Sequence, residues 1–326
     1  MPPRAASPRR LDGLLFFPVT AFDQQGRFAP DAYRAHVQAR LAHNPGAVFA
    51  ACGTGEFPAL APAEYEQIVR TAVEAVDAAA TGETGSAGAD GGAVRVPVIG
   101  GCGYGTALAL EYARAAERAG ADGLLVLPPY SADGGQDGLL RHYTALAAGT
   151  DLDLILYQRD STVFAPETVI ELAQVPNIVG FKDGRGDLDL MLRVVSAVRA
   201  SGTKDFQYFN GMPTAEMTQQ AYRAVGVPLY SSAVFCFAPD IARAFHAALE
   251  GEDRSTADRL VDVFFRPYVQ LRNARPGYAV SLVKALTRST GHDVGPVRAP
   301  LVEPAAEHVV EALALIDRAR EAIAAA

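Results

Sequence analysis

The sequence Val179-Gly180-Phe181-Lys182-Asp183-Gly184 carries an apolar, strand-like run into a lysine and then into glycine-rich chain. The chain has only three lysines, Lys182, Lys204 and Lys284, and arginine supplies the rest of its 29 basic residues. Arginine stays protonated in proteins, whereas a desolvated lysine loses its proton and becomes a nucleophilic amine. Lys182 is therefore a candidate nucleophile. The alternative is a lysine that reaches solvent or pairs with Asp183.

Seven further segments share this strand-like character, and each lies roughly 25–45 residues from the next, the spacing of parallel strands joined by helices. The expected strands are Leu14–Thr20, Ala47–Ala51, Val96–Gly100, Gly123–Leu127, Leu152–Tyr157, Ile178–Lys182, Phe206–Asn210 and Leu229–Ala233. Helix signals fall between them, such as Gly120 after the helical pattern of 106–119 and Asp187 before the next one. The alternation predicts an α/β protein, a (β/α)8 TIM barrel. A doubly wound sheet is the alternative, but no G-x-G-x-x-G follows the first strand.

The barrel is expected to span residues 12–252, with other segments added to it. Residues 1–11 are basic and proline-rich and predict a disordered lead-in. Residues 77–93 are rich in glycine and alanine and predict a flexible insertion away from the catalytic face. Residues 253–326 predict a C-terminal helical block that packs on the barrel or forms a subunit interface. Its expected helices cover 255–271, 278–290 and 305–325.

Composition excludes several classes of protein. The net charge of −8 and the lack of a basic run argue against nucleic-acid binding. Cys52, Cys102 and Cys236 are widely spaced, without the pairing of a zinc site or a disulfide framework. No segment has the length of a signal peptide's apolar region or of a membrane span. We expect a cytoplasmic protein that binds no metal, no nucleic acid and no membrane.

In a barrel of this kind the active site lies at the carboxyl ends of the strands. Gly53 and Thr54 would offer N–H groups and a hydroxyl to a carboxylate, although an ordinary turn has the same sequence. Tyr157 precedes Lys182 by 25 residues, which places them on adjacent strands. Tyr157 is either a proton relay or a core tyrosine. Arg159 is either a ligand of a second substrate carboxylate or a solvated loop residue. Further candidates for substrate binding are Tyr130, Asn210 and Ser231.

Six motifs at the strand ends share a pattern with a known family. They are Phe16-Phe17-Pro18-Val19-Thr20, Ala51-Cys52-Gly53-Thr54-Gly55-Glu56-Phe57, Pro128-Pro129-Tyr130, Tyr157-Gln158-Arg159-Asp160, Gly180-Phe181-Lys182-Asp183-Gly184-Arg185-Gly186-Asp187 and Ser231-Ser232-Ala233-Val234-Phe235. Together they resemble the class I, Schiff-base-forming barrel lyases, which include dihydrodipicolinate synthase and N-acetylneuraminate lyase. The resemblance extends from Gly13 to about Ile316.

The resemblance implies a role for each matching residue. Lys182 would form the Schiff base, and Tyr157 would relay protons. Gly53 and Thr54 would hold the carboxylate of an α-keto acid. Tyr130 occupies the position of a tyrosine that contributes across a subunit contact. The resemblance also implies a homo-oligomer, a dimer or tetramer, that acts on a keto sugar acid without a cofactor.

Within the family, the motifs are most similar to a branch of decarboxylating dehydratases that act on keto-deoxy sugar dicarboxylates. Gly53 lacks the hydroxyl of the synthase proton relay, and Thr162 replaces the synthase arginine. Three positions differ from the asparagines expected in the dehydratases, namely Gln158, Ser161 and Cys236. The alternatives are an aldolase for a 2-keto-3-deoxy sugar acid, a condensing enzyme like dihydrodipicolinate synthase, and a non-catalytic keto-acid-binding barrel.

Overall fold

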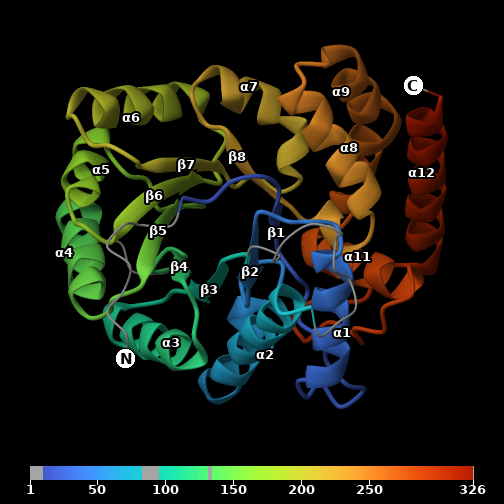
Figure 1. The fold of residues 1–326 in the computed structure, drawn as a ribbon, viewed down its shortest axis with the longest axis horizontal. Helices are drawn as coiled ribbons and strands as arrows, with labels where there is room; N and C mark the ends of the chain where they lie inside the picture. The colour runs from blue at the N-terminus through green and yellow to red at the C-terminus, as the bar shows by residue number, and fades with distance from the viewer. Residues whose placement is uncertain (1–9, 83–94, 131–133, 326) are drawn as a thin grey trace.

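The structure, a computed structural model, describes residues 10–82, 95–130 and 134–325. Eight parallel strands form a closed barrel in chain order, with helices around the outside (Figure 1). The strands are β1 (Leu15–Phe16), β2 (Ala47–Ala50), β3 (Val98–Cys102), β4 (Gly123–Val126), β5 (Asp153–Gln158), β6 (Ile178–Asp183), β7 (Gln207–Asn210) and β8 (Leu229–Ser232). The prediction of a (β/α)8 barrel is confirmed.

Several helices that cover the barrel begin at residues that favour a helix N-terminus. Four of those on the barrel begin at proline, which tolerates the first helical position because its missing N–H has no helical partner there. Asp187 caps another helix by accepting a hydrogen bond from the Leu190 N–H at 3.0 Å. The helices are α1 (Pro30–Leu41), α2 (Pro62–Ala80), α3 (Thr106–Ala119), α4 (Gly135–Ala148), α5 (Pro166–Ala173), α6 (Leu188–Ala200), α7 (Gln219–Ala224) and α8 (Pro239–Glu250).

A C-terminal helical block follows α8. Its elements are α9 (Arg254–Leu260), the π-helical turn η4 (Val261–Phe265), α10 (Arg266–Arg272), α11 (Tyr278–Ser289) and α12 (Ala306–Ala324). The helix expected over 255–271 is thus a continuous run with a π turn inside it. Pro267 explains the turn, because it has no N–H for an α-helical bond and its ring crowds the carbonyl four residues earlier. The last helix, α12, packs against α8, η4, α10 and α11, and Figure 1 shows it along the outer side of the block.

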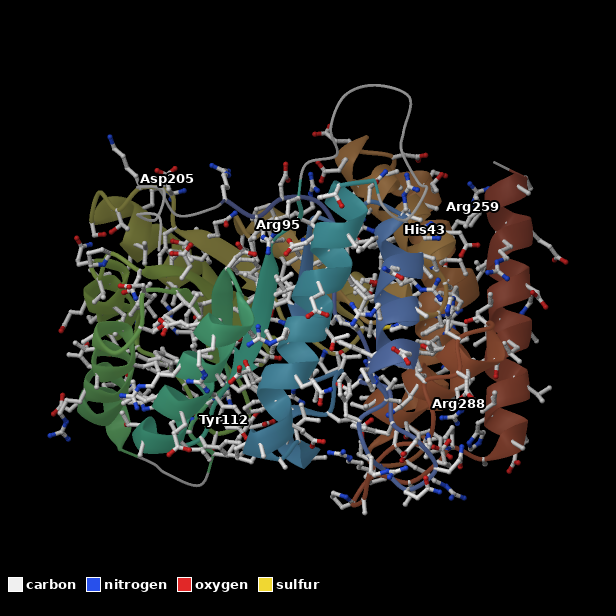
Figure 2. All side chains as sticks on the ribbon, turned by 60° about the horizontal axis from the view of Figure 1, so that its bottom comes forward. His43, Arg95, Tyr112, Asp205, Arg259 and Arg288 are labelled. Atoms are coloured by element: carbon white, nitrogen blue, oxygen red, sulfur yellow. The ribbon has the colours of Figure 1, made fainter. Side chains whose placement is uncertain are left out.

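Two segment expectations need correction. Leu11, placed in the disordered lead-in, has an exposed fraction of only 5% and exchanges two hydrogen bonds with the side chain of Gln207. Helix α2 continues through Ala80, because alanine favours helix, so 77–80 are not part of a flexible insertion. Asp77 in that turn pairs with Arg95 (Figure 2) at 2.5 Å. Residues 1–9 and 83–94 lie outside the described part of the chain.

None of the described helices combines the length and the hydropathy that crossing a lipid bilayer requires. The three cysteine thiols are free and buried. Across the described ranges, no group of three or more histidine, cysteine, aspartate or glutamate side chains could hold a metal ion.

Candidate active site

A cavity of about 330 Å³ lies at the carboxyl ends of the strands, within the size range of small-molecule sites. Its walls come from the strand-end loops and from the C-terminal block, including α11 and the segment at Pro300 and Leu301. Most of the candidate residues named from the sequence line it. They are Gly53, Thr54, Tyr130, Tyr157, Arg159, Lys182 and Ser231.

Lys182, on β6, is one of the residues that line this cavity. Its side chain has an exposed fraction of 4%, and its Nζ lies 4.1 Å from the centroid of the Phe17 ring. Burial lowers the pKa of Lys182 to about 7, because the charged form loses its hydration. A large fraction of the amine is therefore neutral at physiological pH, as a nucleophile requires.

The Asp183 carboxylate is engaged elsewhere and does not neutralise Lys182. It accepts hydrogen bonds from the Gln158 Nε2 at 2.9 Å, from the Tyr222 hydroxyl and from the Arg185 N–H at 3.0 Å. Successive residues of a strand point to opposite faces, so Asp183 faces the helices while Lys182 faces the barrel interior. The pairing between these two neighbours, one alternative left open by the sequence, does not occur.

Tyr157 lies beside Lys182, as the spacing of 25 residues predicted. The two residues are directly paired in the β5–β6 register, and the Lys182 Nζ lies 4.8 Å from the Tyr157 ring centroid. The Tyr157 hydroxyl donates a hydrogen bond to the Gly211 carbonyl at 2.9 Å. Burial raises the pKa of Tyr157 to about 12, although the positive charge of Arg159 opposes this shift. The phenol is therefore protonated at neutral pH and is a proton donor.

Two glycines make room for this pair of side chains. A Cβ on Gly184 would lie 2.9 Å from the Tyr157 hydroxyl oxygen. A Cβ on Gly211 would lie 2.7 Å from the Lys182 Cε and 2.8 Å from the Tyr157 ring. Such contacts are closer than van der Waals packing allows. Glycine is therefore required at both positions for the lysine and the phenol to meet.

Gly53 and Thr54 form the turn that follows β2 and line the cavity. A Cβ on Gly53 would lie 3.8 Å from the Arg159 Nη1, so this guanidinium reaches across the barrel mouth to the turn. N–H groups, a hydroxyl and a guanidinium together suit a carboxylate. Arg159, considered from the sequence for a second carboxylate, thus lies at the same end of the cavity as the Gly53–Thr54 turn.

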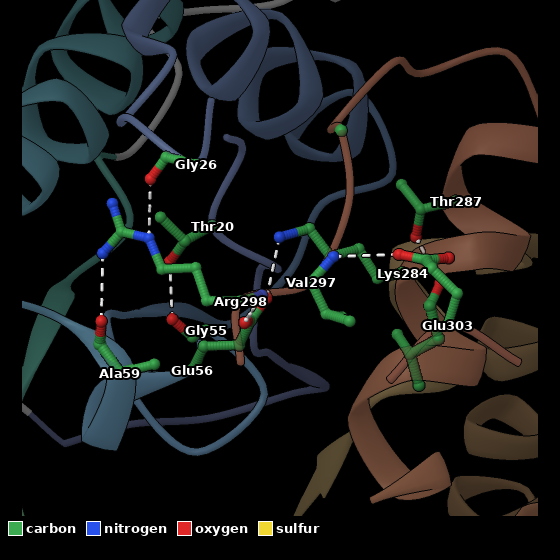
Figure 3. A network of polar contacts seen from close by, with 12 residues as sticks. Thr20, Gly26, Gly55, Glu56, Ala59, Lys284, Thr287, Val297, Arg298 and Glu303 are labelled. Carbon is green, nitrogen blue, oxygen red and sulfur yellow. Dashed lines mark hydrogen bonds and ion pairs between the residues drawn. The ribbon is translucent and has the colours of Figure 1, made fainter. Parts of the chain in front are cut away.

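Glu56, two residues beyond that turn, makes a buried ion pair with Lys284 of α11 (Figure 3). The Glu56 Oε1 lies 2.7 Å from the Lys284 Nζ, and both side chains are fully buried. Burial lowers the pKa of Lys284 to about 8, although the Glu56 carboxylate opposes this shift. The second Glu56 oxygen accepts a hydrogen bond from the Arg298 N–H at 2.9 Å.

Arg298 extends this network to the first half of the barrel (Figure 3). Its guanidinium donates to the Gly26 carbonyl at 2.8 Å and the Ala59 carbonyl at 3.0 Å, and it pairs with Glu64. It also lies over the Phe22 ring, 3.9 Å from the centroid. The network fastens the C-terminal block to the loop that carries Gly53 and Thr54. Neither Glu56 nor Lys284 was expected at the site from the sequence, although the scarcity of lysine is a signal for both buried lysines.

Asn210 does not line the cavity, which corrects its assignment as a substrate ligand. Its side chain is fully buried, with the Nδ2 donating to Thr218 Oγ1 and Gln219 Oε1 and the Oδ1 accepting from the Met212 N–H. The register explains the error, because Asn210 is paired with Asp183, and paired residues of parallel strands point to the same face. Asn210 therefore faces outward.

Gln158, Ser161 and Cys236, where the chain departs from the expected asparagines, also lie outside the cavity walls. Gln158 belongs to the same outward row as Asp183. Ser161 is exposed on the loop after β5. The Cys236 thiol is buried and donates to the Phe17 carbonyl at 3.0 Å. None of the three departures changes a side chain that lines the cavity.

Arg272 and Thr214 line the cavity and were not identified from the sequence. The Arg272 Nη1 donates to the Pro213 carbonyl at 2.6 Å and to the Thr214 Oγ1 at 2.9 Å. Arg272 ends α10, 58 residues after Thr214. No local sequence pattern connects a helix end with a loop at this separation.

Comparison with known proteins reveals extensive similarity. The model of the dihydrodipicolinate synthetase family matches residues 10–319. A protein of Streptomyces avermitilis named probable 5-dehydro-4-deoxyglucarate dehydratase 1 is 58% identical over 306 residues, covering 94% of this chain and 93% of the relative. Proteins named probable 5-dehydro-4-deoxyglucarate dehydratase occur at 55% identity in Streptomyces griseus, covering 99% and 96%, and at 43% in Pseudomonas putida, covering 94% and 95%.

Solved structures agree with the fold. Dihydrodipicolinate synthase from Bacillus clausii superposes with a TM-score of 0.81 at 23% identity, covering 94% of this chain and 97% of the other. A monomeric dihydrodipicolinate synthase variant superposes with a TM-score of 0.80 at 24% identity, covering 98% and 99%. At this level of identity the likeness concerns the barrel and its C-terminal helices.

Proposed function

Because this chain belongs to the dihydrodipicolinate synthetase family, we propose that it converts 5-dehydro-4-deoxy-D-glucarate into 2,5-dioxopentanoate, water and carbon dioxide. The resemblance inferred from the strand-end motifs is confirmed at the level of the family. The relatives that carry the dehydratase name support the substrate. The single observation that carries the mechanism is the buried Lys182, whose amine lies beside the Tyr157 ring in a closed barrel.

The first half of the reaction builds an electron sink. The neutral amine of Lys182 attacks the C5 ketone, and loss of water gives an iminium ion. Gly53 and Thr54 hold the adjacent C6 carboxylate, and Arg159 adds its positive charge at that end. The iminium acidifies the C4 protons, and removal of one gives an enamine. Tyr157 mediates these proton transfers, because its ring lies 4.8 Å from the Lys182 Nζ.

The second half expels two small molecules. The enamine pushes out the C3 hydroxyl as water, with a proton supplied by the site, and a conjugated iminium results. Electrons of the C1–C2 bond then flow into this iminium, and C1 leaves as carbon dioxide. Tautomerisation at C2 and hydrolysis of the iminium release 2,5-dioxopentanoate and the free lysine. Because the iminium accepts the electrons, the reaction as proposed needs neither a metal nor an organic cofactor.

Conversion of the dicarboxylate tests this proposal directly. We expect one equivalent of carbon dioxide and one of 2,5-dioxopentanoate per substrate consumed, measured by mass spectrometry of product and gas. Release of pyruvate would instead identify an aldolase, because retro-aldol cleavage retains the carboxylate. Condensation of pyruvate with aspartate semialdehyde would identify a synthase. A protein that binds keto acids but releases no product would be a non-catalytic binding barrel.

Tyr157→Phe removes only the phenolic hydroxyl and keeps the packing against Gly184 and Gly211. We expect kcat to fall about 10²- to 10⁴-fold, the usual contribution of a positioned acid–base group. Borohydride should still trap the imine at Lys182, because the amine remains neutral and buried. Unchanged kcat in this variant would remove Tyr157 from the mechanism.

We further propose a homo-oligomer, a dimer or tetramer, in the cytoplasm. Val302 and Val310 of the C-terminal block support the first point, because they are apolar and have exposed fractions of 55% and 67%. Tyr130 lies half-buried at the cavity wall and would complete a site shared between subunits. The three free thiols suit a reducing compartment.

A further inference from the structure

We propose that Arg272 of the C-terminal block binds the distal C1 carboxylate and thereby selects dicarboxylates over keto acids with a single carboxylate. This inference rests on the proposed function for the identity of the substrate. It assigns specificity to a helix outside the (β/α)8 unit. The observations that carry it are the guanidinium's partners, the groups around it and its position relative to Lys182.

Arg272 has only neutral hydrogen-bond partners. Its Nη1 donates to the Pro213 carbonyl and the Thr214 hydroxyl, and its Nε and Nη2 donate to the Asn273 Oδ1 at 3.1 and 3.0 Å. Among the described residues it makes no ion pair with a carboxylate. The buried Glu216 acts on this guanidinium electrostatically without a direct ion pair, and burial raises the pKa of Glu216 to about 7, which weakens its negative charge near neutral pH. A half-buried guanidinium at a cavity wall with no carboxylate bonded to it suits an anionic ligand.

Two hydroxyl groups accompany Arg272. The Thr214 hydroxyl accepts from the guanidinium, so its own proton remains available to a ligand. Tyr268 lies four residues before Arg272 on the same helix and also lines the cavity. Its exposed fraction is 1%, and its hydroxyl has no hydrogen-bond partner within the described ranges. A buried hydroxyl without a partner is costly, and a bound carboxylate would satisfy it.

The two guanidinium groups of the cavity lie on either side of Lys182. Arg159 follows β5 and reaches to the Gly53 turn. The Arg272 guanidinium is hydrogen-bonded to the Pro213 carbonyl, in the loop that follows β7. Because the barrel order is β5-β6-β7, the strand of Lys182 separates them. A keto acid whose ketone reaches Lys182 and whose near carboxylate lies at Gly53 directs its far end toward Arg272.

The chemistry of the distal carboxylate determines which kinetic constant responds. A guanidinium stabilises the bound carboxylate before C1 leaves, and it stabilises the transition state for carbon dioxide loss less, because negative charge then moves into the iminium. The contact therefore contributes mostly to substrate binding and appears in KM. Substitution of a residue with a purely structural role would instead change KM for every substrate alike.

The experiment compares three ligands in reductive trapping by borohydride. The first is the dicarboxylate, the second its analogue with a hydroxymethyl group in place of the distal carboxylate, and the third pyruvate. We expect Arg272→Gln to raise the half-saturating concentration of the dicarboxylate about 10- to 100-fold, the range for a hydrogen bond to a charged group. The values for the other two ligands should stay unchanged. Arg272→Lys should fall between Gln and wild type, because it keeps the charge without the planar fork.

Arg266→Gln is the matched control, since Arg266 lies on the same helix but is exposed, and within the described ranges its ion pair is with Asp262 of its own helical run. The inference would be overturned if Arg272→Gln raised the half-saturating concentrations of all three ligands in parallel. An unchanged half-saturating concentration for the dicarboxylate would overturn it as well. Carbon dioxide release by the wild-type protein separates this result from the proposed function. Selective trapping without carbon dioxide release would support Arg272 as the carboxylate ligand and refute the dehydratase reaction.

Discussion

Replacement of Lys182 by alanine should lower kcat/KM by about 10⁴-fold or more, and borohydride with the dicarboxylate should no longer label the protein. Removal of a covalent nucleophile has effects of this size because no other group can form the intermediate. Lys182→Arg should be equally inactive, because a guanidinium stays protonated and cannot form an imine. Turnover is measured by product formation, and labelling by peptide mass mapping.

Lys204→Ala is the matched control, because Lys204 is exposed and lies outside the cavity walls. We expect wild-type turnover and wild-type labelling of residue 182 in this variant. Labelling of Lys284 in the wild-type protein would contradict the assignment, since that amine is held by Glu56 at 2.7 Å. Retained imine formation in Lys182→Ala would contradict it as well.

The pH dependence of the wild-type protein gives a second measure of Lys182. Burial lowers the pKa of this amine to about 7, so the reactive neutral form grows as pH rises through 7. The rate of imine formation with pyruvate should therefore increase between about pH 6 and 8 and level off above, as shown by trapping at several pH values. An ordinary lysine would give a rate that still rises near its usual pKa of about 10.4.

Much of the barrel and the reacting pair could be predicted from residue patterns. Strand-like segments at regular spacing define the barrel, and the 25-residue interval between Tyr157 and Lys182 places them on neighbouring strands. The register shows why this inference held. Tyr157, Lys182 and Phe209 form one paired row that faces inward. A lysine in such a row is desolvated by the barrel itself.

The Asn210 assignment failed because a strand-end position does not determine which face a side chain occupies. Gln158, Asp183 and Asn210 form the adjacent paired row, which faces the helices. Advancing one residue along a strand moves a side chain to the other face. Asn210 could have been excluded only once its pairing with Asp183 was known.

Arg272 and Lys284 were missed for a different reason. Both lie on amphipathic helices of the C-terminal block, where periodicity predicts a buried face and not the partner it meets. Lys284 lies 228 residues from Glu56, and Arg272 lies 58 residues from Thr214. Contacts at such separations depend on how the block docks on the barrel. Lysine scarcity marks all three lysines alike, and only the position of Lys182 at the end of an apolar, strand-like run singled it out.

Lys284→Met should lower the free energy of unfolding by about 3–5 kcal/mol, measured by urea denaturation at one fixed protein concentration. The variant removes the Lys284 ammonium and leaves the Glu56 carboxylate fully buried. Because water does not reach this carboxylate, hydration does not replace the lost attraction. Arg193→Met is the control, because the Arg193–Asp189 pair is exposed and contributes less than about 1 kcal/mol. Equal losses in the two variants would show that the Glu56–Lys284 pair is not effectively buried.

The double variant Glu56→Gln/Lys284→Met separates stability from function. With both charges removed, most of the lost stability should return, because a neutral amide beside an apolar side chain carries no unpaired charge. Activity should not return to the same extent. Glu56, two residues after the Gly53–Thr54 turn, adopts a left-handed backbone with φ of 60°, and the Arg298 N–H donates to its second oxygen. Glutamine accepts at only one oxygen, so the turn loses one of its two anchors to the C-terminal block. A raised half-saturating concentration of pyruvate in borohydride trapping, despite restored stability, would show that this ion pair positions the carboxylate-binding turn. Full recovery of both stability and pyruvate trapping would limit the role of the pair to folding.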